Sequence, residues 1–502
     1  MRKAGSSVDY MHLQNGSDIR GVALEGIAGE NVTLTQDAVL HIARGFAAWL
    51  RRGRGEAPLR VALGRDSRLS GEQIAGWLAG ELSRLGIGVT DMGLATTPAM
   101  FMTTVTPGYM FDGAVMITAS HLPWNRNGLK FFTARGGAES SDIREILGWE
   151  GPAEDAAVPG IVENGEFMDV YAAILREKII SAAGRERPLA GRRIVVDAGN
   201  GAGGFFAGKV LEPLGADTAG SVFLEPDGRF PNHVPNPELP AAMDSIRQAV
   251  LDSGADFGII FDTDVDRAGA VLRSGEELNR NRLIALISAI VLREHPGTAI
   301  VTDSITSTGL AAFISRRGGV HRRFKRGYRN VINEGLRLNA GGTDCQLAIE
   351  TSGHAAMKEN YFLDDGAYLV TKFLIELACG RDLEAMISDL AEPAESREFR
   401  MKITEPDFKA AGQAVLDELA RYAAAQPGWS TEKENYEGVR VNLDRDHGNG
   451  WFLLRLSLHD PLLPLNIESD SPGGLRRIAR ELAPFLAEQT AVDAGALLEA
   501  AV

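Results

Sequence analysis

Residues 256–267 read DFGIIFDTDVDR, and this stretch decides the fold. Residues 257–261 are apolar throughout, which is typical of a strand that helices cover on both faces of a sheet. The second half of the stretch starts where the strand ends and carries Asp262, Asp264 and Asp266 at alternate positions. In α/β sheets, ligands bind beyond the carboxyl ends of the strands. The stretch therefore predicts an α/β fold with polar site residues at the end of a buried strand.

The same pattern, a short apolar run followed by a loop rich in Gly, Ser, Asp or Asn, occurs five more times. The additional runs are RVAL at 60–63, GAVMI at 113–117, RRIVV at 192–196, TAIV at 298–301 and CQLAI at 345–349. By position the six strands form three pairs, near 61 and 115, near 195 and 259, and near 300 and 347. Segments of helical period lie between them. In residues 37–53, the apolar side chains on one face are Val39, Leu40, Ala43, Phe46, Ala47 and Leu50. We expect three α/β units of similar plan.

The last hundred residues follow a different pattern. After a stretch typical of a linker, AEPAESRE at 391–398, we expect a strand at 399–403 and a helix at 407–425. Two strands follow, around 436–443 and 451–458, and then a helix from Ser471, which we expect to cap it before Pro472. This order predicts a small α+β domain as a fourth module, in agreement with about 100 to 200 residues per domain in a chain of 502 residues.

Composition restricts the class of function. The chain has 52 Lys and Arg against 67 Asp and Glu, a net charge of −15, which disfavours binding to nucleic acid or to an anionic membrane surface. Only two cysteines occur, Cys345 and Cys379, too few for a disulfide scaffold or a structural zinc site. The first residues lack the apolar core of a signal peptide, and the longest apolar run, 283–292, is too short to span a bilayer. We expect a cytoplasmic protein.

The loop FDTDVDR at 261–267 predicts a metal site. Three carboxylates so close together repel one another unless a hard cation neutralises them, and all-oxygen ligands favour Mg²⁺ over Zn²⁺. An EF-hand is excluded, because Arg267 and Arg273 stand where that loop requires Gly and Glu. The alternative is an acidic surface turn.

Two further loops carry candidate catalytic and sugar-binding groups. TASHLPWNRNGLKFF at 118–132 places Ser120 and His121 at a strand end, although a Ser-His pair is also common in simple turns. ETSGH at 350–354 offers Glu350 and Ser352 for sugar hydroxyls and His354 as an acid or base, with a helix cap by Ser352 as the alternative.

Two basic segments are candidate anion sites. RLSLHDP at 455–461 has Arg455, Ser457 and His459 at alternate positions, a pattern that also fits an exposed strand edge. HRRFKRGYR at 321–329, which ends on Arg329, is either a second phosphate contact or a solvated face.

Taken together and in this order, the loops resemble those of the α-D-phosphohexomutase family, the phosphoglucomutases and phosphomannomutases, over nearly the whole chain. The serine loop of that family is matched at 118–123 with a downstream match at 127–130, the metal loop at 262–267 and the sugar loop at 349–354. Supporting matches are SDIRG with Arg20, GRDSR at 64–68, DAGNGAGG at 197–204, DGRFPNHVPNP at 227–237 and DDG at 364–366.

The resemblance implies four domains around a central cleft: three similar mixed α/β sheet domains and a C-terminal α+β (TBP-like) domain. We expect the phosphoserine loop in residues 1–158, the metal loop in 159–277, the sugar-binding loop in 278–392 and the phosphate-binding loop in 393–502.

The resemblance also implies a mechanism and a set of roles. Phosphorylated Ser120 donates its phosphoryl group to a sugar phosphate, and the resulting bisphosphate turns over and returns the other phosphoryl group to the serine. One Mg²⁺ per chain binds Ser120 and the three aspartates, and a hexose 1,6-bisphosphate serves as activator. The implied catalytic residues are Ser120, Lys130, His354, Arg20, Arg267 and His121. The implied substrate-binding residues are Glu350, Ser352, Arg455, Ser457, His459 and Arg329.

One loop departs from the family pattern, and other functions remain open. The family's phosphate loop reads R-x-S-G-T-E-P, whereas here RLSLHDP runs on to LLP, which leaves the sugar open. We expect a phosphohexomutase that acts on glucose or mannose phosphates, as a monomer or homodimer. The alternatives are a phosphoglucosamine mutase, a haloacid-dehalogenase-type phosphotransferase that uses Asp262 as nucleophile, and a non-catalytic sugar-phosphate-binding protein.

Overall fold

A computed structural model of the chain describes residues 9–52, 57–152, 155–457 and 460–502. The chain divides into two compact units, Met1–Leu283 with Ser352–Met386, and Ile284–Thr351 with Ile387–Val502. Among the described residues, no helix is both long and apolar enough to cross a membrane.

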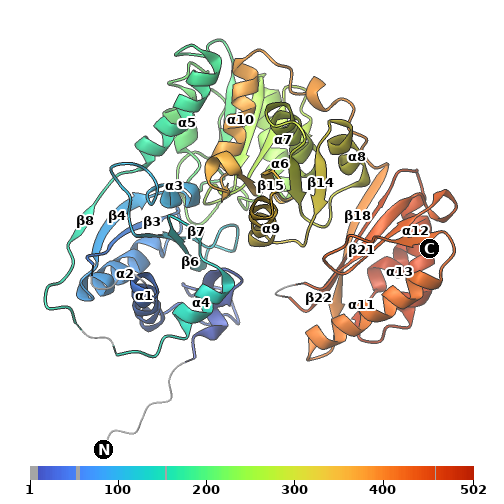
Figure 1. The fold of residues 1–502 in the computed structure, drawn as a ribbon, viewed down its shortest axis with the longest axis horizontal. Coiled ribbons are helices and arrows are strands. Elements are labelled where there is room, and N and C mark those ends of the chain that lie inside the picture. The colour runs from blue at the N-terminus through green and yellow to red at the C-terminus, as the bar shows by residue number, and fades with distance from the viewer. Residues whose placement is uncertain (1–8, 53–56, 153–154, 458–459) are drawn as a thin grey trace, which may run out of the picture. The chain divides into compact units, whose positions relative to one another are not determined.

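The first unit begins with a mixed sheet in the strand order β1-β2-β6-β5-β3-β4-β8, with β7 paired to β6 (Figure 1). β3 and β5, which were paired only by their positions near 61 and 115, are parallel neighbours, and β5 is buried along its whole length. Helices α1, α2 and α4 contribute apolar side chains to one core with these strands. The strands are β1 (Gln14–Asn15), β2 (Asp18–Val22), β3 (Arg60–Arg65), β4 (Gly88–Leu94), β5 (Gly113–Ile117), β6 (Arg126–Thr133), β7 (Gly136–Gly137) and β8 (Val162–Asn164), and the helices are η1 (Met11–Leu13), α1 (Gln36–Arg51), α2 (Gly71–Arg84), α3 (Thr97–Met102) and α4 (Ser140–Leu147).

The second sheet of this unit has the order β12-β11-β10-β9, in which β9 and β10, the strands near 195 and 259, are parallel neighbours. β10 and β11 form an antiparallel hairpin, and the loop between them is the predicted metal loop. Helices α5 and α10 pack against each other (Figure 1). The strands of this sheet are β9 (Ile194–Asp197), β10 (Phe257–Phe261), β11 (Ala268–Leu272) and β12 (Glu277–Leu278). The unit also contains β16 (Ala355–Met357) and β17 (Leu363–Asp364), which pair with each other and do not belong to this sheet. The helices are α5 (Met168–Ala183), the π-helix η2 (Phe206–Leu211), α6 (Pro240–Ser253), η3 (Lys358–Asn360) and α10 (Gly366–Ala378).

The second unit contains the third pair of strands, near 300 and 347. β13 lies between β14 and β15 and is parallel to both. Each of the six apolar runs is therefore a strand, and each predicted pair is a pair of parallel neighbours. The strands of this part are β13 (Ala299–Thr302), β14 (Val320–Arg323) and β15 (Cys345–Ile349), and the helices are α7 (Arg280–Glu294), α8 (Thr308–Arg316), α9 (Tyr328–Ala340) and η4 (Ala385–Ile387).

The C-terminal part is a sheet in the order β19-β20-β21-β22-β18-β23 with three α-helices. The prediction omitted β22, which lies between β21 and β18 and pairs with both. The supposed linker at 391–398 is wrong in its second half, because β18 begins at Glu395. The elements are β18 (Glu395–Ile403), α11 (Phe408–Ala425), β19 (Trp429–Thr431), β20 (Val439–Leu443), η5 (Arg445–His447), β21 (Gly450–Leu454), β22 (Leu462–Ser469), α12 (Gly474–Ala487), β23 (Val492–Asp493) and α13 (Gly495–Ala501).

Two local predictions were wrong. Helix α12 is capped by Gly473 and not by Ser471, and the carboxylate of Glu395 accepts hydrogen bonds from the backbone N–H groups of Gly473 and Leu475, both at 2.8 Å. In α1, Leu40 is half-buried, while Ile42 belongs to the buried face. A carboxylate from a distant strand thus replaces a local cap.

Candidate active site

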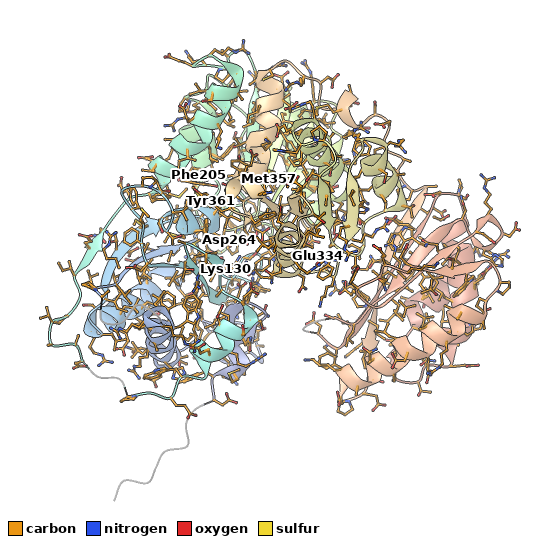
Figure 2. The ribbon with its side chains drawn as sticks, in the orientation of Figure 1. Lys130, Phe205, Asp264, Glu334, Met357 and Tyr361 are labelled. Atoms are coloured by element: carbon orange, nitrogen blue, oxygen red, sulfur yellow. The ribbon has the colours of Figure 1, made fainter. Side chains whose placement is uncertain are left out.

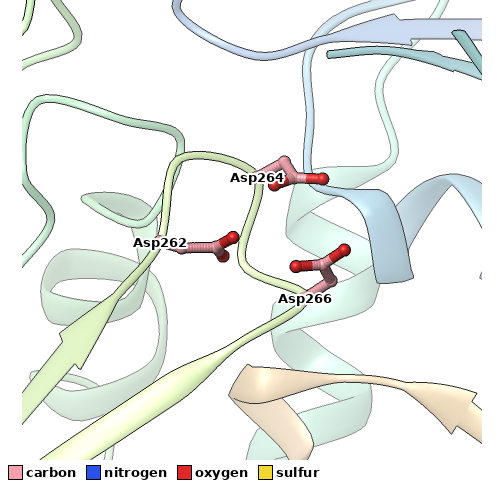
Figure 3. A group of neighbouring side chains, drawn as sticks. All are labelled: Asp262, Asp264 and Asp266. Atoms are coloured by element: carbon pink, nitrogen blue, oxygen red, sulfur yellow. The ribbon is translucent and has the colours of Figure 1, made fainter. Parts of the chain in front are cut away.

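The metal loop brings three buried carboxylates together. One carboxylate oxygen each of Asp262, Asp264 and Asp266 lies within 4.8 Å of the other two, and Figure 3 shows the three side chains on the single loop that follows β10. Between them Val265 is fully buried and has a φ of 66°. A β-branched residue adopts this conformation only under strain, at a cost of about 1–3 kcal/mol. The loop therefore needs support from its surroundings.

Three separate segments give that support through backbone hydrogen bonds. Thr97 N–H donates to Asp264 O at 2.9 Å, Ala202 N–H to Thr263 O at 2.8 Å, and Gly366 N–H to Val265 O at 3.0 Å. Glycine is required at the last of these positions, because a Cβ on Gly366 would stand 2.6 Å from the carbonyl carbon of Arg267. The loop is clamped from outside its own hairpin.

The side-chain partners of the carboxylates leave room for a cation. Thr97 Oγ1 donates to Asp264 Oδ2 at 2.5 Å, and Lys130 Nζ lies 3.1 Å from the same oxygen and also contacts Asp266; Figure 2 labels Lys130 and Asp264. Asp264 Oδ1 is buried and has no hydrogen-bond partner among the described residues. A buried carboxylate oxygen without a hydrogen-bond partner is costly. Because the metal ligands that the three aspartates offer are all oxygen atoms, these residues fit a hard divalent cation.

Ser120 lies directly beside this cluster. Its Oγ donates to Asp262 Oδ2 at 3.0 Å and accepts from Arg267 Nη2 at 2.8 Å. Arg267 in turn donates from Nε to Asp262 Oδ2 at 3.1 Å. The serine is buried and has a φ of 51°, an uncommon conformation that is found at functional sites. A hydroxyl is therefore held between a carboxylate and a guanidinium.

Arg68 fixes the shape of the serine loop. Its guanidinium donates to the carbonyl oxygen of Ser120, to Leu122 O at 2.6 Å, to Pro123 O at 2.8 Å and to Arg126 O at 2.9 Å. Its charge is balanced by Asp66 at 3.3 Å, and both side chains are fully buried. One side chain thus satisfies four carbonyl groups of a loop that has no regular structure.

The remaining predicted residues of this unit surround the serine and the aspartates. His354 Nε2 lies 3.5 Å from Asp266 Oδ1, and its Nδ1 lies 2.8 Å from Ser352 Oγ. His121 Nδ1 lies 3.3 Å from Ser120 Oγ and contacts Arg267. Arg20 donates to Ala119 O at 3.2 Å and pairs with Asp18 at 2.8 Å. The structure therefore brings Ser120, His121, Lys130, Arg267, His354 and the three aspartates together, with Arg20 on the backbone next to the serine.

Burial and neighbouring charges shift the pKa values of Asp262 and Asp266 in opposite directions. Burial, followed by the charges of Asp266 and Asp264, raises the pKa of Asp262 well above its usual range. Burial acts in the same direction on Asp266, but the charges of Lys130 and His354 outweigh it and hold the pKa of Asp266 well below its usual range. Without a cation the loop cannot keep all three carboxylates charged at low cost.

The other predicted substrate-binding residues lie in the second unit. Glu350 is buried and its Oε1 accepts from Gly327 N–H at 2.6 Å, while Arg329 is the second residue of α9. Arg455 and Ser457 follow β21, where Arg455 N–H donates to Pro464 O at 3.1 Å and Ser457 N–H to Leu462 O at 2.9 Å. Arg455 Nε is buried with no hydrogen-bond partner among the described residues. His459 lies outside the described residues.

The basic segment 321–329 is largely engaged within the unit. Arg322 pairs with Glu334 at 3.0 Å and with Glu434 at 2.9 Å, and Arg323 donates to Ser307 O at 3.1 Å. Structural partners hold these two residues, and a phosphate contact by the segment stays a prediction.

The sequence interpretation missed two residues that shape the site. Arg68 belongs to GRDSR, whose resemblance to the family motif is a signal for it, although its role as a clamp was not predicted. Thr97 gives no signal, because an ordinary helix start brings it to Asp264, which is 167 positions away along the chain.

Comparisons with known proteins agree with this geometry. Family models for the α/β/α domains I, II and III of phosphoglucomutase/phosphomannomutase match residues 11–148, 169–275 and 279–394, together more than half of the chain.

Curated relatives match over nearly their full length. The chain is 31% identical to a phosphoglucomutase of Neisseria gonorrhoeae over 456 residues, which covers 91% of this chain and 93% of that protein. It is 32% identical to a phosphomannomutase/phosphoglucomutase of Pseudomonas aeruginosa (strain PAO1), with 92% and 94% covered. A crystal structure of a phosphoglucomutase/phosphomannomutase family protein from Burkholderia thailandensis superimposes with a TM-score of 0.76 at 27% identity and covers 94% of this chain and 96% of that one.

Proposed function

Because the chain belongs to the phosphoglucomutase/phosphomannomutase family and is a phosphohexomutase, we propose that it interconverts hexose 1-phosphate and hexose 6-phosphate through a phosphoserine at Ser120. The observation that carries this proposal is the placement of Ser120 Oγ, 3.0 Å from Asp262 and 2.8 Å from Arg267. Glucose and mannose phosphates are the proposed substrates, since the two relatives are named for one or both of these activities.

The reaction is two phosphoryl transfers in opposite directions. In the first, the bond between Ser120 Oγ and phosphorus breaks, a free sugar hydroxyl bonds to phosphorus, and the hydroxyl proton passes to a base on the protein. The bisphosphorylated sugar then presents its other phosphate, and the same steps run in reverse. Catalysis of such a transfer is mainly a matter of position and charge, and Arg267 Nη2 stands next to the serine oxygen on which charge develops.

The proton acceptors we propose are Lys130 and His354. Both contact Asp266, so an acidic residue orients each of them close to the transferred group. His121 and Arg20 hold the serine loop through the serine oxygen, the Arg267 guanidinium and the carbonyl of Ala119.

Asp262, Asp264, Asp266 and a phosphate oxygen on Ser120 would hold one Mg²⁺. When bound, the cation offsets negative charge on the transferred phosphoryl group. The fit of the aspartates to a hard cation supports this assignment, and a hexose 1,6-bisphosphate is the proposed activator that restores a dephosphorylated serine.

The sugar and its second phosphate are assigned to the other predicted residues. We propose that Glu350 and Ser352 bind sugar hydroxyls and that Arg455, Ser457, His459 and Arg329 bind the phosphate that does not react. The positions of Arg455 and Ser457 directly after β21 support this role.

The domain division stays a proposal as well, with boundaries after residues 158, 277 and 392. The ends of the three family matches, at 148, 275 and 394, support it. A cytoplasmic location and a small-molecule substrate, with no role on nucleic acid, fit two cysteines and a net charge of −15.

A mutase assay tests the proposal. Purified protein with Mg²⁺ and a trace of hexose bisphosphate is given glucose, mannose and glucosamine 1-phosphates in turn, and formation of each 6-phosphate is measured. Turnover of glucose or mannose 1-phosphate is expected. Preference for glucosamine 1-phosphate would mean that the proposed substrates are wrong. Phosphopeptide mapping of the same sample should find phosphate on Ser120, and phosphate on Asp262 instead would overturn the mechanism.

A further inference from the structure

A second cavity lies in the first unit, apart from the residues of the active site. Its volume is about 970 Å³, and it is lined by the ends of β3, β4 and β8, the start of α5, and residues 202–212 with the π-helix η2. Neither Ser120 nor any of the three aspartates lines it. Cavities of several hundred Å³ at the junction of two sheets are common ligand sites.

Its place in the fold favours ligand binding. β3, β4 and β8 run parallel, so their carboxyl ends meet at one edge, the position at which α/β sheets bind ligands. The wall opposite includes a π-helix, an uncommon element that is frequent at functional sites. Gly93 and Gly208 both line the cavity and have open space where a Cβ would stand. The backbone therefore leaves room for a ligand to approach closely.

The charged residues that line the cavity favour a positively charged ligand. Six carboxylates and two cations line the cavity among the described residues. Both cations are already engaged, since Arg65 makes two hydrogen bonds to Asp91, at 3.0 and 3.1 Å, and Lys209 pairs with Asp169. The other four acidic residues, Glu72, Glu166, Glu212 and Glu225, are solvent-exposed and carry the excess of negative charge around the cavity. Such a lining repels sugar phosphates and attracts cations.

The cavity also has apolar walls. Leu94, Phe167, Phe205 and Leu224 line it together with the acidic residues, and Phe205 is labelled in Figure 2. Aromatic faces attract ammonium groups, and apolar side chains suit the methylene groups between them. We propose that this cavity binds a small organic cation of the diamine or polyamine class, a ligand distinct from the sugar phosphate of the active site.

The two walls of the cavity connect directly to the metal loop. One wall runs through Ala95 to Thr97, whose N–H donates to Asp264 O, and the other contains Ala202, whose N–H donates to Thr263 O. A ligand that shifts either wall changes the position of a carboxylate in the metal loop. Binding of the amine and binding of the divalent cation are therefore coupled, and by linkage each changes the affinity of the other by the same factor.

Calorimetric titration of the full-length protein with spermidine tests the proposal. A matched pair of variants identifies the site: Gly208→Leu places a side chain in the cavity, and Gly80→Leu places the same side chain in open space on α2, outside the cavity lining. We expect one spermidine per chain, at least about tenfold weaker binding in Gly208→Leu and unchanged binding in Gly80→Leu. The double variant Glu166→Gln, Glu225→Gln should also bind more weakly.

Three results would overturn it. Equal spermidine binding in the wild type and Gly208→Leu would assign the heat to the acidic surface as a whole. Equal binding of 1,8-octanediol, which has similar length and no charge, would refute the ligand class. For the coupling, Mn²⁺ affinity is measured by electron paramagnetic resonance with and without spermidine. A shift of at least about threefold is expected in the wild type and none in Gly208→Leu, whereas an unchanged constant in the wild type refutes the coupling. These readouts measure binding, so they stand apart from the mutase assay.

Discussion

Replacing Thr97 by valine removes one oxygen from the surroundings of the metal loop and almost no volume. The Thr97 hydroxyl is buried and donates to Asp264 Oδ2 at 2.5 Å, while Asp264 Oδ1 is buried without a hydrogen-bond partner among the described residues. The backbone N–H of residue 97 still donates to Asp264 O after the change. Thr97→Val therefore frees the carboxylate to rotate without releasing the loop.

The size of the effect follows from two independent estimates. A hydrogen bond to a charged group contributes about 1.5–3 kcal/mol. Loss of a residue that orients a metal ligand lowers metal affinity by about 10–100-fold, which corresponds to about 1.4–2.8 kcal/mol. Since Lys130 still contacts Asp264 Oδ2, we expect the lower half of this range, a decrease of roughly 10–30-fold in Mn²⁺ affinity.

Free Mn²⁺ measured by electron paramagnetic resonance gives the dissociation constant directly, without an activity assay. Thr97→Ser keeps the hydroxyl and should keep the affinity. The neighbouring Thr96 is a matched control, because its Oγ1 accepts from Ala99 N–H as the cap of α3 and does not contact the aspartates. Thr96→Val should lower the melting temperature by the loss of a cap, worth about 1 kcal/mol, and leave Mn²⁺ affinity unchanged.

Either of two results would refute the reasoning. Wild-type Mn²⁺ affinity in Thr97→Val would mean that the hydroxyl does not orient Asp264. An equal loss in Thr96→Val would mean that the start of α3, and not one hydrogen bond, determines the affinity. In the mutase assay at saturating Mg²⁺, kcat is the quantity expected to fall, with little change in KM for the sugar.

Further predictions concern three other positions. Ser120→Ala should abolish mutase activity and radiolabelling by hexose bisphosphate while its melting temperature stays near that of the wild type, and residual label on the protein would contradict the phosphoserine. Burial raises the pKa of Asp365 to about 6 from 3.8. The folded state therefore binds this proton more tightly, and the wild type should gain about 2 kcal/mol relative to Asp365→Asn as the pH falls from 6 to 4. A constant difference in melting temperature over that window would contradict this. Glu395→Gln should destabilise the C-terminal part by about 1 kcal/mol, because the charge at the start of α12 is lost, and Glu405→Gln on the exposed surface serves as its control.

The strands that build the site could be predicted, because a strand that is buried on both faces of its sheet has apolar residues at every position. β5 and β10 are apolar at every position and each ends at a loop with a site residue. The three aspartates could be predicted as a cluster because two-residue spacing within one short loop keeps them close whatever the rest of the chain does.

Contacts between distant segments could not be predicted in the same way. β22 contains Pro464, which cannot donate to a neighbouring strand and argues against a central position, yet β22 pairs with strands on both sides. The cap of α12 comes from Glu395, 78 positions before Gly473. Thr97 and Arg68 act on loops that only the folded chain brings to them. In each case the contact joins segments that are distant in sequence and depends on tertiary packing, so no local sequence pattern predicts it.

The hydrogen bonds of Arg68 to the backbone of the serine loop should keep the shape of the loop when the side chain at position 120 is changed. The arginine contacts main-chain carbonyl groups and its charge is balanced by Asp66, so the shape of the loop does not depend on which side chain residue 120 carries. A φ of 51° at that residue is one that asparagine and aspartate adopt more readily than most. Asparagine at position 120 should therefore leave the fold of the first unit unchanged, whereas aspartate would place a fourth buried carboxylate beside Asp262.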